Sequence, residues 1–301
     1  MAIQTYTDAF ITAPDGLRLH ARCYGRPNRA ALPVVCLPGL TRTAADFDAL
    51  ASALAADNTN PRRVIALDYR GRGESDYDRD PRNYNVHTEL RDVLAVVTAL
   101  EALPAIYIGT SRGGILAMLL AGARPSAIAG VVLNDIGPVL DPKGLLRIKS
   151  YVGKLPRPAN FEDGAEILRR LFSAQFPKLT PEDWLASAQR AFKPDKKGRL
   201  VPTYDIRIAR TLRSIKPDEP APPLWSQFDA LQSVPLMVIR GANSDLLSPA
   251  TLEAMRARRS SLKVIEVPDQ GHAPLLAEPE IVARIGTFVA RCDRSDGHCR
   301  I

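Results

Sequence analysis

Four short, almost uninterrupted apolar runs dominate the first 135 residues of this 301-residue chain. They lie at 33–39, 63–69, 105–111 and 130–135. Strands that are buried on both faces, as in a parallel sheet covered by helices, have this composition. Between these runs, stretches rich in alanine and leucine at 43–56, 86–102 and 113–123 favour helices. The alternation predicts an α/β fold built on a mostly parallel sheet.

The two ends of the chain extend this pattern. Residues 7–13 and 17–24 flank the turn sequence Pro-Asp-Gly, so we expect a hairpin before the first buried strand. Further strands are predicted at 234–241 and 262–269, and further helices at 249–258 and 278–291. The sheet is therefore expected to resume late in the chain.

The segment 138–228 differs from its flanks. Its apolar residues occur with helical spacing at 165–176 and 181–192, and strand patterns are missing. It holds 17 of the 40 Lys and Arg residues but only 10 of the 33 Asp and Glu residues, so the whole net charge of +7 lies in it. Nine of the eighteen aromatic residues lie there too. We therefore predict an all-helical insertion at 138–228 between two parts of one core, 1–137 and 229–301.

Composition narrows the class of protein. With 46% apolar and 24% charged residues, the chain is typical of a globular protein with a substantial core. The positive charge comes with no nucleic-acid-binding motif, so a nucleic-acid partner is not expected. The first residues lack a basic stretch followed by an apolar one, and no run of 18 apolar residues occurs. We expect a cytoplasmic protein that does not bind a membrane.

The four cysteines are too sparse for a disulfide scaffold, and none forms a C-x-x-C pair. Cys292, His298 and Cys299 gather near the C-terminus, but their spacing matches no common zinc site. We expect free thiols and no metal.

The strongest motif is GTSRGG at 109–114, which follows a predicted strand and precedes a predicted helix. A sharp strand-to-helix turn requires small residues two positions before and after its central serine, because a Cβ there would clash with neighbouring backbone. The helix N-terminus adds positive potential where a negative oxygen would form. The motif predicts that Ser111 is a nucleophile.

A serine hydroxyl needs a neighbouring base to become nucleophilic at neutral pH. His272 follows the predicted strand at 262–269, and parallel strands would bring it to the same sheet edge as Ser111. The other three histidines lie in the first hairpin (His20), at the start of a helix (His87) and in the polar tail (His298). Position therefore favours His272 as the base.

Two carboxylates compete to orient the imidazole. Asp245 follows the predicted strand 234–241, and Asp135 ends the strand at 130–135; both are expected at the relevant sheet edge. The chain order Ser111, Asp245, His272 agrees with the order expected for this class of fold, so we favour Asp245. Asp135 would then be a structural or substrate-facing acid.

Charge that develops on the substrate oxygen needs two backbone donors. One is expected to be the N–H of Arg112, directly after the nucleophile, and the other the N–H of Leu40, beside Gly39 in an earlier loop. The Arg112 side chain is suited to bind a substrate carboxylate, or to pair inside the protein, for example with Asp135.

Taken together, these motifs resemble the alpha/beta-hydrolase superfamily. The resemblance covers about 1–137 and 229–291, and it rests on four ordered motifs. These are LPGL at 37–40, DYRGRGESD at 68–76, GTSRGG at 109–114, and GANSD at 241–245 with GH at 271–272. It implies an eight-stranded sheet flanked by helices, a helical lid inserted after the sixth strand, which matches 138–228, and neither a metal nor an organic cofactor.

The chain departs from this family at two positions. The oxyanion loop has Pro38-Gly39 where many relatives begin with His-Gly, and Arg112 stands where an apolar residue is more usual. Related dehalogenases and epoxide hydrolases have an aspartate at the turn between strand and helix. The presence of Ser111 there argues against both activities.

The favoured hypothesis is a serine hydrolase that cleaves a carboxylic ester, thioester or lactone of a small molecule through an acyl-enzyme. The same residues would also suit hydrolysis of a carbon–carbon bond in a meta-cleavage product, or acyl transfer to an alcohol. A ligand receptor or an inactive scaffold on this fold is the non-enzyme alternative. The sequence leaves monomer and homodimer equally open.

Overall fold

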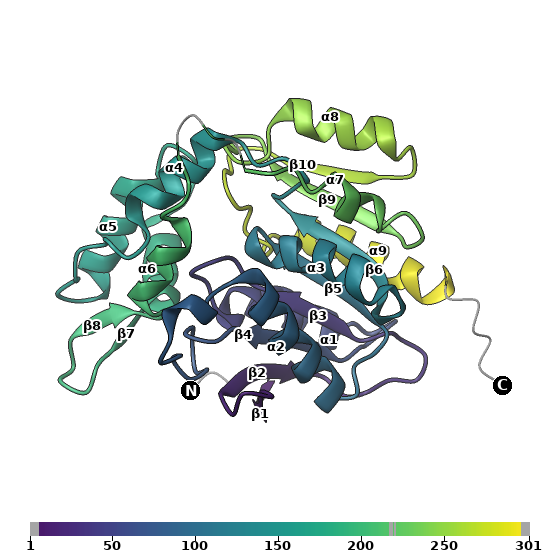
Figure 1. Cartoon of the computed structure of the whole chain (residues 1–301), viewed down its shortest axis with the longest axis horizontal. Coiled ribbons are helices and arrows are strands. Elements are labelled where there is room, and N and C mark those ends of the chain that lie inside the picture. Colours follow the sequence, from purple (N-terminus) through teal and green to yellow (C-terminus); the bar gives the residue numbers. More distant parts are fainter. Residues whose placement is uncertain (1–5, 217–218, 220, 296–301) are drawn as a thin grey trace.

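A computed structural model describes residues 6–216, 219 and 221–295 (Figure 1). Its strands are β1 (Tyr6–Thr12), β2 (Arg18–Tyr24), β3 (Val34–Leu37), β4 (Val64–Asp68), β5 (Ala105–Thr110), β6 (Ile128–Asn134), β7 (Phe192–Pro194), β8 (Leu200–Pro202), β9 (Leu236–Gly241) and β10 (Lys263–Val267). Its α-helices are α1 (Asp48–Ala55), α2 (Val86–Ala99), α3 (Arg112–Ala123), α4 (Pro142–Tyr151), α5 (Phe161–Phe172), α6 (Pro181–Ala191), α7 (Trp225–Asp229), α8 (Pro249–Arg258) and α9 (Pro279–Ser295).

Within the described residues, one eight-stranded sheet has the order β1-β2-β4-β3-β5-β6-β9-β10. The hairpin β1-β2 is antiparallel and pairs antiparallel with β4. All other neighbours are parallel, so the mostly parallel sheet expected from the sequence is confirmed. The carboxyl ends of β3, β5, β6, β9 and β10 consequently lie at one edge.

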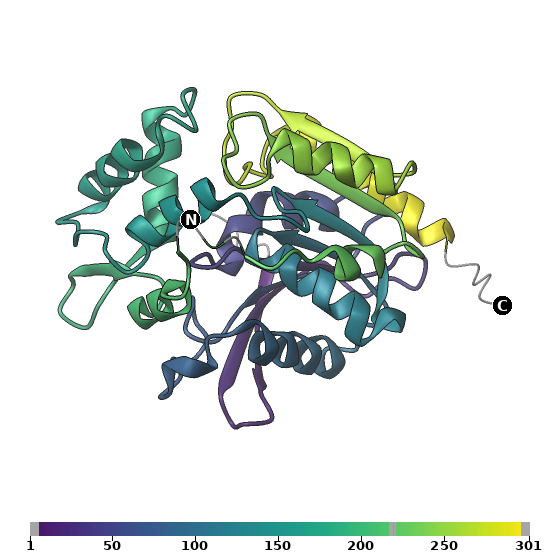
Figure 2. The same cartoon turned by 45° about the horizontal axis from the view of Figure 1, so that its top comes forward.

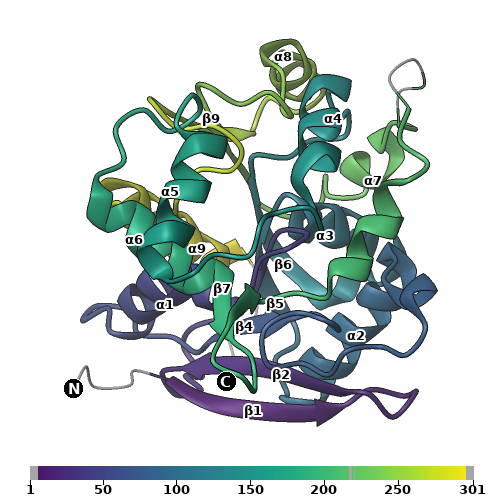
Figure 3. The ribbon, with the colours of Figure 1, turned by 90° about the vertical axis from the view of Figure 1, so that its left-hand side faces the viewer.

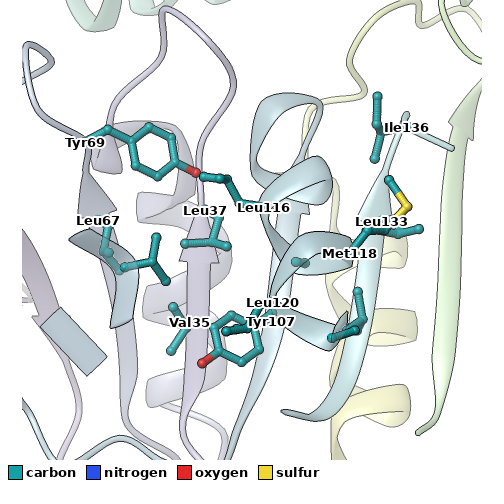
Figure 4. Close-up of a cluster of buried hydrophobic side chains, with 14 of the residues drawn as sticks. Val35, Leu37, Leu67, Tyr69, Tyr107, Leu116, Met118, Leu120, Leu133 and Ile136 are labelled. Carbon is teal, nitrogen blue, oxygen red and sulfur yellow. The ribbon is translucent and has the colours of Figure 1, made fainter. Parts of the chain in front are cut away.

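Both faces of the sheet are buried, which explains the continuous apolar runs. In β3, Val35 and Leu37 join the core under α2 and α3, whereas Val34 and Cys36 join the core under α1 and α9. Figures 1 and 2 show these helix pairs on opposite sides of the sheet, and Figure 4 shows part of the first core. This alternation fixes the register of each strand, because a shift of the strand by one residue would move every side chain to the opposite face of the sheet.

An ion pair ties the hairpin to the parallel part of the sheet. His20 of β2 is buried, with Nδ1 2.7 Å from Asp68 Oδ2 and Nε2 2.8 Å from Asp8 Oδ1. Burial by itself lowers the pKa of His20, but the two carboxylates outweigh it and raise the pKa above its usual value. The native state therefore holds this proton more tightly than the unfolded chain does.

Replacing His20 with glutamine is expected to lower the free energy of unfolding by about 3 kcal/mol in mildly acidic solution, as for other broken buried pairs. Because the folded pKa is raised, the stabilisation is complete below the unfolded value of about 6.5 and is lost as the pH rises through the folded pKa. Urea unfolding from pH 6 to 9 should show the gap between wild type and variant narrowing. The exposed His87→Gln is the control, and a gap that widens with pH would contradict the assignment.

Between β6 and β9, helices α4 to α6 and strands β7 and β8 lie to the left of the sheet in Figure 1 and face the viewer in Figure 3. Helices α5 and α6 pack against each other and enclose a small core of their own. Members of this core are Ala165, Leu168, Phe176, Trp184, Ala188, Phe192 and Leu200.

The expectation of an all-helical insertion is wrong, because β7 and β8 form an antiparallel hairpin. Asp195 accepts hydrogen bonds from the amides of Lys197 and Arg199, and Gly198 has the positive φ of +74° that such a turn requires. The prolines that end both three-residue strands suggested breaks between helices. The Asp-Lys-Lys-Gly turn was the signal for a hairpin.

Candidate active site

Ser111 stands at the tip of a tight turn between β5 and α3, with φ 51° and ψ −110°. Glycine is required on both sides of it. A Cβ on Gly113 would lie 2.0 Å from the carbonyl oxygen of Leu37, and a Cβ on Gly109 would lie 2.5 Å from the backbone of Gly113. The close approach of α3 to the sheet thus holds the serine in a strained conformation above the strand ends.

Ser111, His272 and Asp135 form one hydrogen-bonded chain. His272 Nε2 lies 2.8 Å from Ser111 Oγ, and His272 Nδ1 lies 2.7 Å from Asp135 Oδ2. An ionised carboxylate only accepts hydrogen bonds, so Nδ1 donates to Asp135 and Nε2 is left to accept the serine proton. Ser111 follows β5, Asp135 follows β6 and His272 lies in the loop after β10. The parallel strands thus bring Ser111 and His272, which are 161 positions apart, into contact. The expected contact between Ser111 and His272 is present.

The carboxylate beside His272 is Asp135, and the expectation of Asp245 there is wrong. Asp135 is fully buried and has φ 53°. Its Oδ1 accepts the amide of Gly241 at 2.9 Å, and its Oδ2 accepts the hydroxyl of Ser244 at 2.5 Å as well as the imidazole. A buried carboxylate with this many donors is not a substrate-facing acid, so that second expectation for Asp135 is also wrong.

Asp245 is held instead by the inserted segment. Arg147 of α4 donates to both of its oxygens, at 2.6 and 2.8 Å. A Cβ on Gly144 would lie 2.6 Å from the Asp245 carbonyl, so α4 packs directly on this loop. Burial raises the pKa of Asp245, but Arg147 outweighs it and brings the pKa below its ordinary value. The order of residues along the chain carried no information on this pairing.

Two backbone amides near Ser111 have no acceptor among the described residues. Among the hydrogen bonds of the described residues, none has the amide of Leu40 or of Arg112 as its donor. A Cβ on Gly39 would lie 3.9 Å from Ser111 Cβ, so the loop that carries Leu40 lies beside Ser111. The geometry leaves both amides available to a ligand oxygen.

The Arg112 side chain does not reach a substrate. Its Nε donates to Glu89 at 2.7 Å, and Arg112 is absent from the lining of the cavity above Ser111. The expectation that this side chain binds substrate is therefore wrong. Its internal partner is Glu89 on α2 and not Asp135.

Glu89 is connected to both residues whose amides are free: to Arg112 directly and to Leu40 through Arg72. It is completely buried and lies 2.9 Å from Arg72 Nη1, and Arg72 Nε donates to the carbonyl of Leu40 at 2.9 Å. Burial raises the pKa of Glu89, but Arg72 and Arg112 outweigh it and lower the pKa. Sequence reasoning missed Glu89. The signal that could have found it was an acidic residue on the buried face of the helix predicted at 86–102.

A cavity of about 820 Å³ opens above Ser111 and His272. Its walls combine the core with the inserted segment. Aromatic side chains of that segment make up much of the wall: Tyr151, Phe172, Phe176, Trp184, Phe192 and Tyr204. The cavity is large enough for a small organic molecule, and Ser111 and His272 are part of its lining.

Comparison with known families decides the classification. The model of the alpha/beta hydrolase family matches residues 34–285. The chain belongs to the alpha/beta hydrolase family. This alpha/beta hydrolase is 37% identical to the 3-hydroxybutyrate-oligomer hydrolase of Cupriavidus necator, over 91% of this chain and 94% of the relative. It is 24% identical to the 2-(acetamidomethylene)succinate hydrolase of Mesorhizobium japonicum, over 82% and 83% of the two chains.

A solved structure agrees with this assignment. The crystal structure of an alpha/beta hydrolase from Novosphingobium aromaticivorans is 40% identical, with a TM-score of 0.89, over 96% of this chain and 100% of that one. The likeness therefore includes the segment between β6 and β9 as well as the sheet.

The described part of this alpha/beta hydrolase holds no group of three or more metal-ligating side chains. Cys292 is buried and its thiol donates to the Phe288 carbonyl, whereas His298 and Cys299 lie outside the described residues. Among the described helices, none has the length and apolarity to span a membrane.

Proposed function

We propose that this alpha/beta hydrolase cleaves carboxylic esters through an acyl-enzyme on Ser111. The hydrogen-bonded chain from Ser111 through His272 to Asp135 carries the proposal. Ser111 Oγ attacks the ester carbonyl carbon while its proton passes to His272 Nε2. The amides of Leu40 and Arg112 donate to the oxygen that becomes negative. Asp135 stabilises the imidazolium and fixes its orientation.

The remaining steps return the enzyme to its starting state. His272 gives its proton to the departing alkoxide, which leaves as the alcohol, and Ser111 keeps the acyl group. Water then attacks the acyl carbon and loses a proton to His272 Nε2. The bond to Ser111 Oγ breaks, the proton returns to Oγ and the carboxylic acid departs. In this scheme the segment 138–228 acts as the lid, because its side chains close the cavity over the serine.

For the substrate, we propose esters of short hydroxy acids. The relative named 3-hydroxybutyrate-oligomer hydrolase supports this class, because the units of such an oligomer are joined by ester bonds. The aromatic and aliphatic walls of the cavity suit the methyl-bearing chain of such a molecule. Thioesters and lactones would undergo the same steps on the same residues.

The proposal is tested by incubating the protein with the linear dimer of 3-hydroxybutyrate and following release of the monomer by chromatography. Reaction with a fluorophosphonate probe is measured in parallel. Labelling with release of monomer supports the proposal. Labelling without release would contradict the substrate class, and absence of labelling in folded protein would contradict the serine mechanism itself.

Replacing Glu89 with glutamine is expected to lower kcat by about 10- to 100-fold with little change in KM, which is less than the roughly 100- to 1000-fold loss on removal of an oxyanion donor, because both amides stay in the chain. The reason is that Glu89 positions Arg112, and through Arg72 the carbonyl of Leu40, without touching substrate. Steady-state kinetics on a neutral ester measures kcat and KM separately and so tests this expectation. Asp92→Asn breaks another buried ion pair of α2, with Arg70, and serves as the control. Equal losses of kcat in both variants would show a purely structural role.

A further inference from the structure

A cluster of charges lies in the cavity where the core meets the inserted segment. Arg42 Nε and Nη2 donate to the two oxygens of Asp46 at 2.5 and 2.6 Å. Arg190 of α6 approaches the same carboxylate, with Nε 3.4 Å from Asp46 Oδ1. All three residues line the cavity. Two guanidinium groups thus share one carboxylate, and the cluster has a net positive charge.

Asp48, the other acid that acts on Arg190, has a cationic partner of its own. Asp48 is the next carboxylate along the chain, and Arg22 Nη1 donates to both of its oxygens, at 2.8 and 2.7 Å. The hydrogen bond that the Arg190 side chain donates goes to the neutral hydroxyl of Ser187 at 3.3 Å. Burial lowers the pKa of Arg190, and Asp46 offsets this only in part. The nearby carboxylates therefore do not fully offset the cost of burying the charge of Arg190.

The cluster is open to a ligand. The side chains of Arg42, Asp46 and Arg190 are 35%, 21% and 30% exposed, and the cavity is the space that they border. It also lies beside the reacting serine. The position that a Cβ would take on Gly39 is 3.3 Å from Arg42 Cγ and 3.9 Å from Ser111 Cβ. Ser111, Arg42 and Arg190 also line the same cavity, so a molecule that fills it can contact both the hydroxyl and the guanidinium groups.

The rest of the cavity restricts the shape of such a molecule. Phe172 and Phe176 contribute apolar surface, and Trp184 lies on α6, the helix that also carries Arg190. A ligand that satisfies both regions has an apolar part and one anionic group. A carboxylate is the anion that two arginines bind with paired, charge-assisted hydrogen bonds.

We propose that Arg42 and Arg190 form a carboxylate-binding subsite, and that the preferred substrates are esters that carry one free carboxylate. This inference rests on the proposed ester hydrolysis and names the substrate feature that the cavity selects. It places anion recognition on residues of the oxyanion loop and the inserted segment, and not on Arg112.

The test compares two substrates, an ester with one free carboxylate and the same ester with that carboxylate methylated. In Arg190→Gln, KM for the carboxylate substrate should rise about 10- to 100-fold, the effect expected for loss of a charged hydrogen bond, while kcat changes little. KM for the methylated substrate should stay the same. Lys196→Gln removes the same charge from an exposed site outside the cavity and should leave both substrates unaffected.

Two further measurements keep the test decisive. Arg42→Gln is the second variant, with the same expected selectivity, and the methylated substrate reports whether each variant is folded and active. In wild type, added salt should raise KM for the carboxylate substrate alone. Equal kinetic constants for both substrates in every variant would overturn the subsite while leaving ester hydrolysis intact. Failure of wild type to cleave either substrate would overturn ester hydrolysis itself.

Discussion

Alanine at position 111 is expected to lower kcat by about 10⁴- to 10⁶-fold, the range seen when a serine nucleophile is removed. Its hydroxyl is the group that His272 Nε2 meets at 2.8 Å, so no acyl-enzyme can form without it. Steady-state hydrolysis of the hydroxy-acid dimer measures the loss. Covalent labelling by a fluorophosphonate should disappear at the same time.

The structure also provides a control for this variant. Ser226 lies on α7, outside the lining of the cavity, and Ser226→Ala should retain both labelling and hydrolysis. Thermal unfolding should be similar for all three proteins, because the turn around Ser111 is fixed by Gly109 and Gly113 and not by the hydroxyl. Hydrolysis that persists in Ser111→Ala would show that another group attacks the substrate.

The second large effect concerns the acid. Asp135→Asn is expected to lower kcat by about 10⁴-fold, since an amide in this place favours the wrong tautomer of the imidazole. Asp245→Asn should lower kcat by less than about 10-fold, because it weakens only the ion pair with Arg147. The two substitutions are the same chemical change at the ends of neighbouring strands. Kinetics on one neutral ester compares them directly.

The outcome of this pair separates two assignments. A large loss in Asp245→Asn with a small loss in Asp135→Asn would return the orienting role to Asp245. Circular dichroism controls for folding, because Asp135 also accepts hydrogen bonds from Gly241 and Ser244. Asparagine retains one acceptor oxygen for these donors.

The sheet could be predicted from sequence because its signals are local. Each buried strand reads as an apolar run. The small residues that a sharp strand-to-helix turn requires are visible in the sequence two positions before and after Ser111, as Gly109 and Gly113. The position of His272 followed from the same logic, since parallel strands bring their carboxyl ends together. These features need no knowledge of distant partners.

The choice of acid could not be predicted in this way. Asp135 and Asp245 follow neighbouring strands, β6 and β9, and what separates them is the position of Arg147, which lies in the inserted segment. Likewise, Arg112 was expected to face a ligand, whereas Glu89 of another helix holds it. Both errors concern long-range pairing of charges, which leaves no periodic trace in the sequence.

The inserted segment leaves the sheet after β6 and returns to it at β9, and these two strands are hydrogen-bonded neighbours. Its two points of attachment to the sheet are thus adjacent. Ser111, His272 and Asp135 all lie outside the inserted segment, in loops that follow strands of the sheet. An unrelated segment of another length could be grafted between the same strands without altering the reactive trio. Under the proposed mechanism, selectivity is therefore free to diversify in this architecture while Ser111, His272 and Asp135 stay the same.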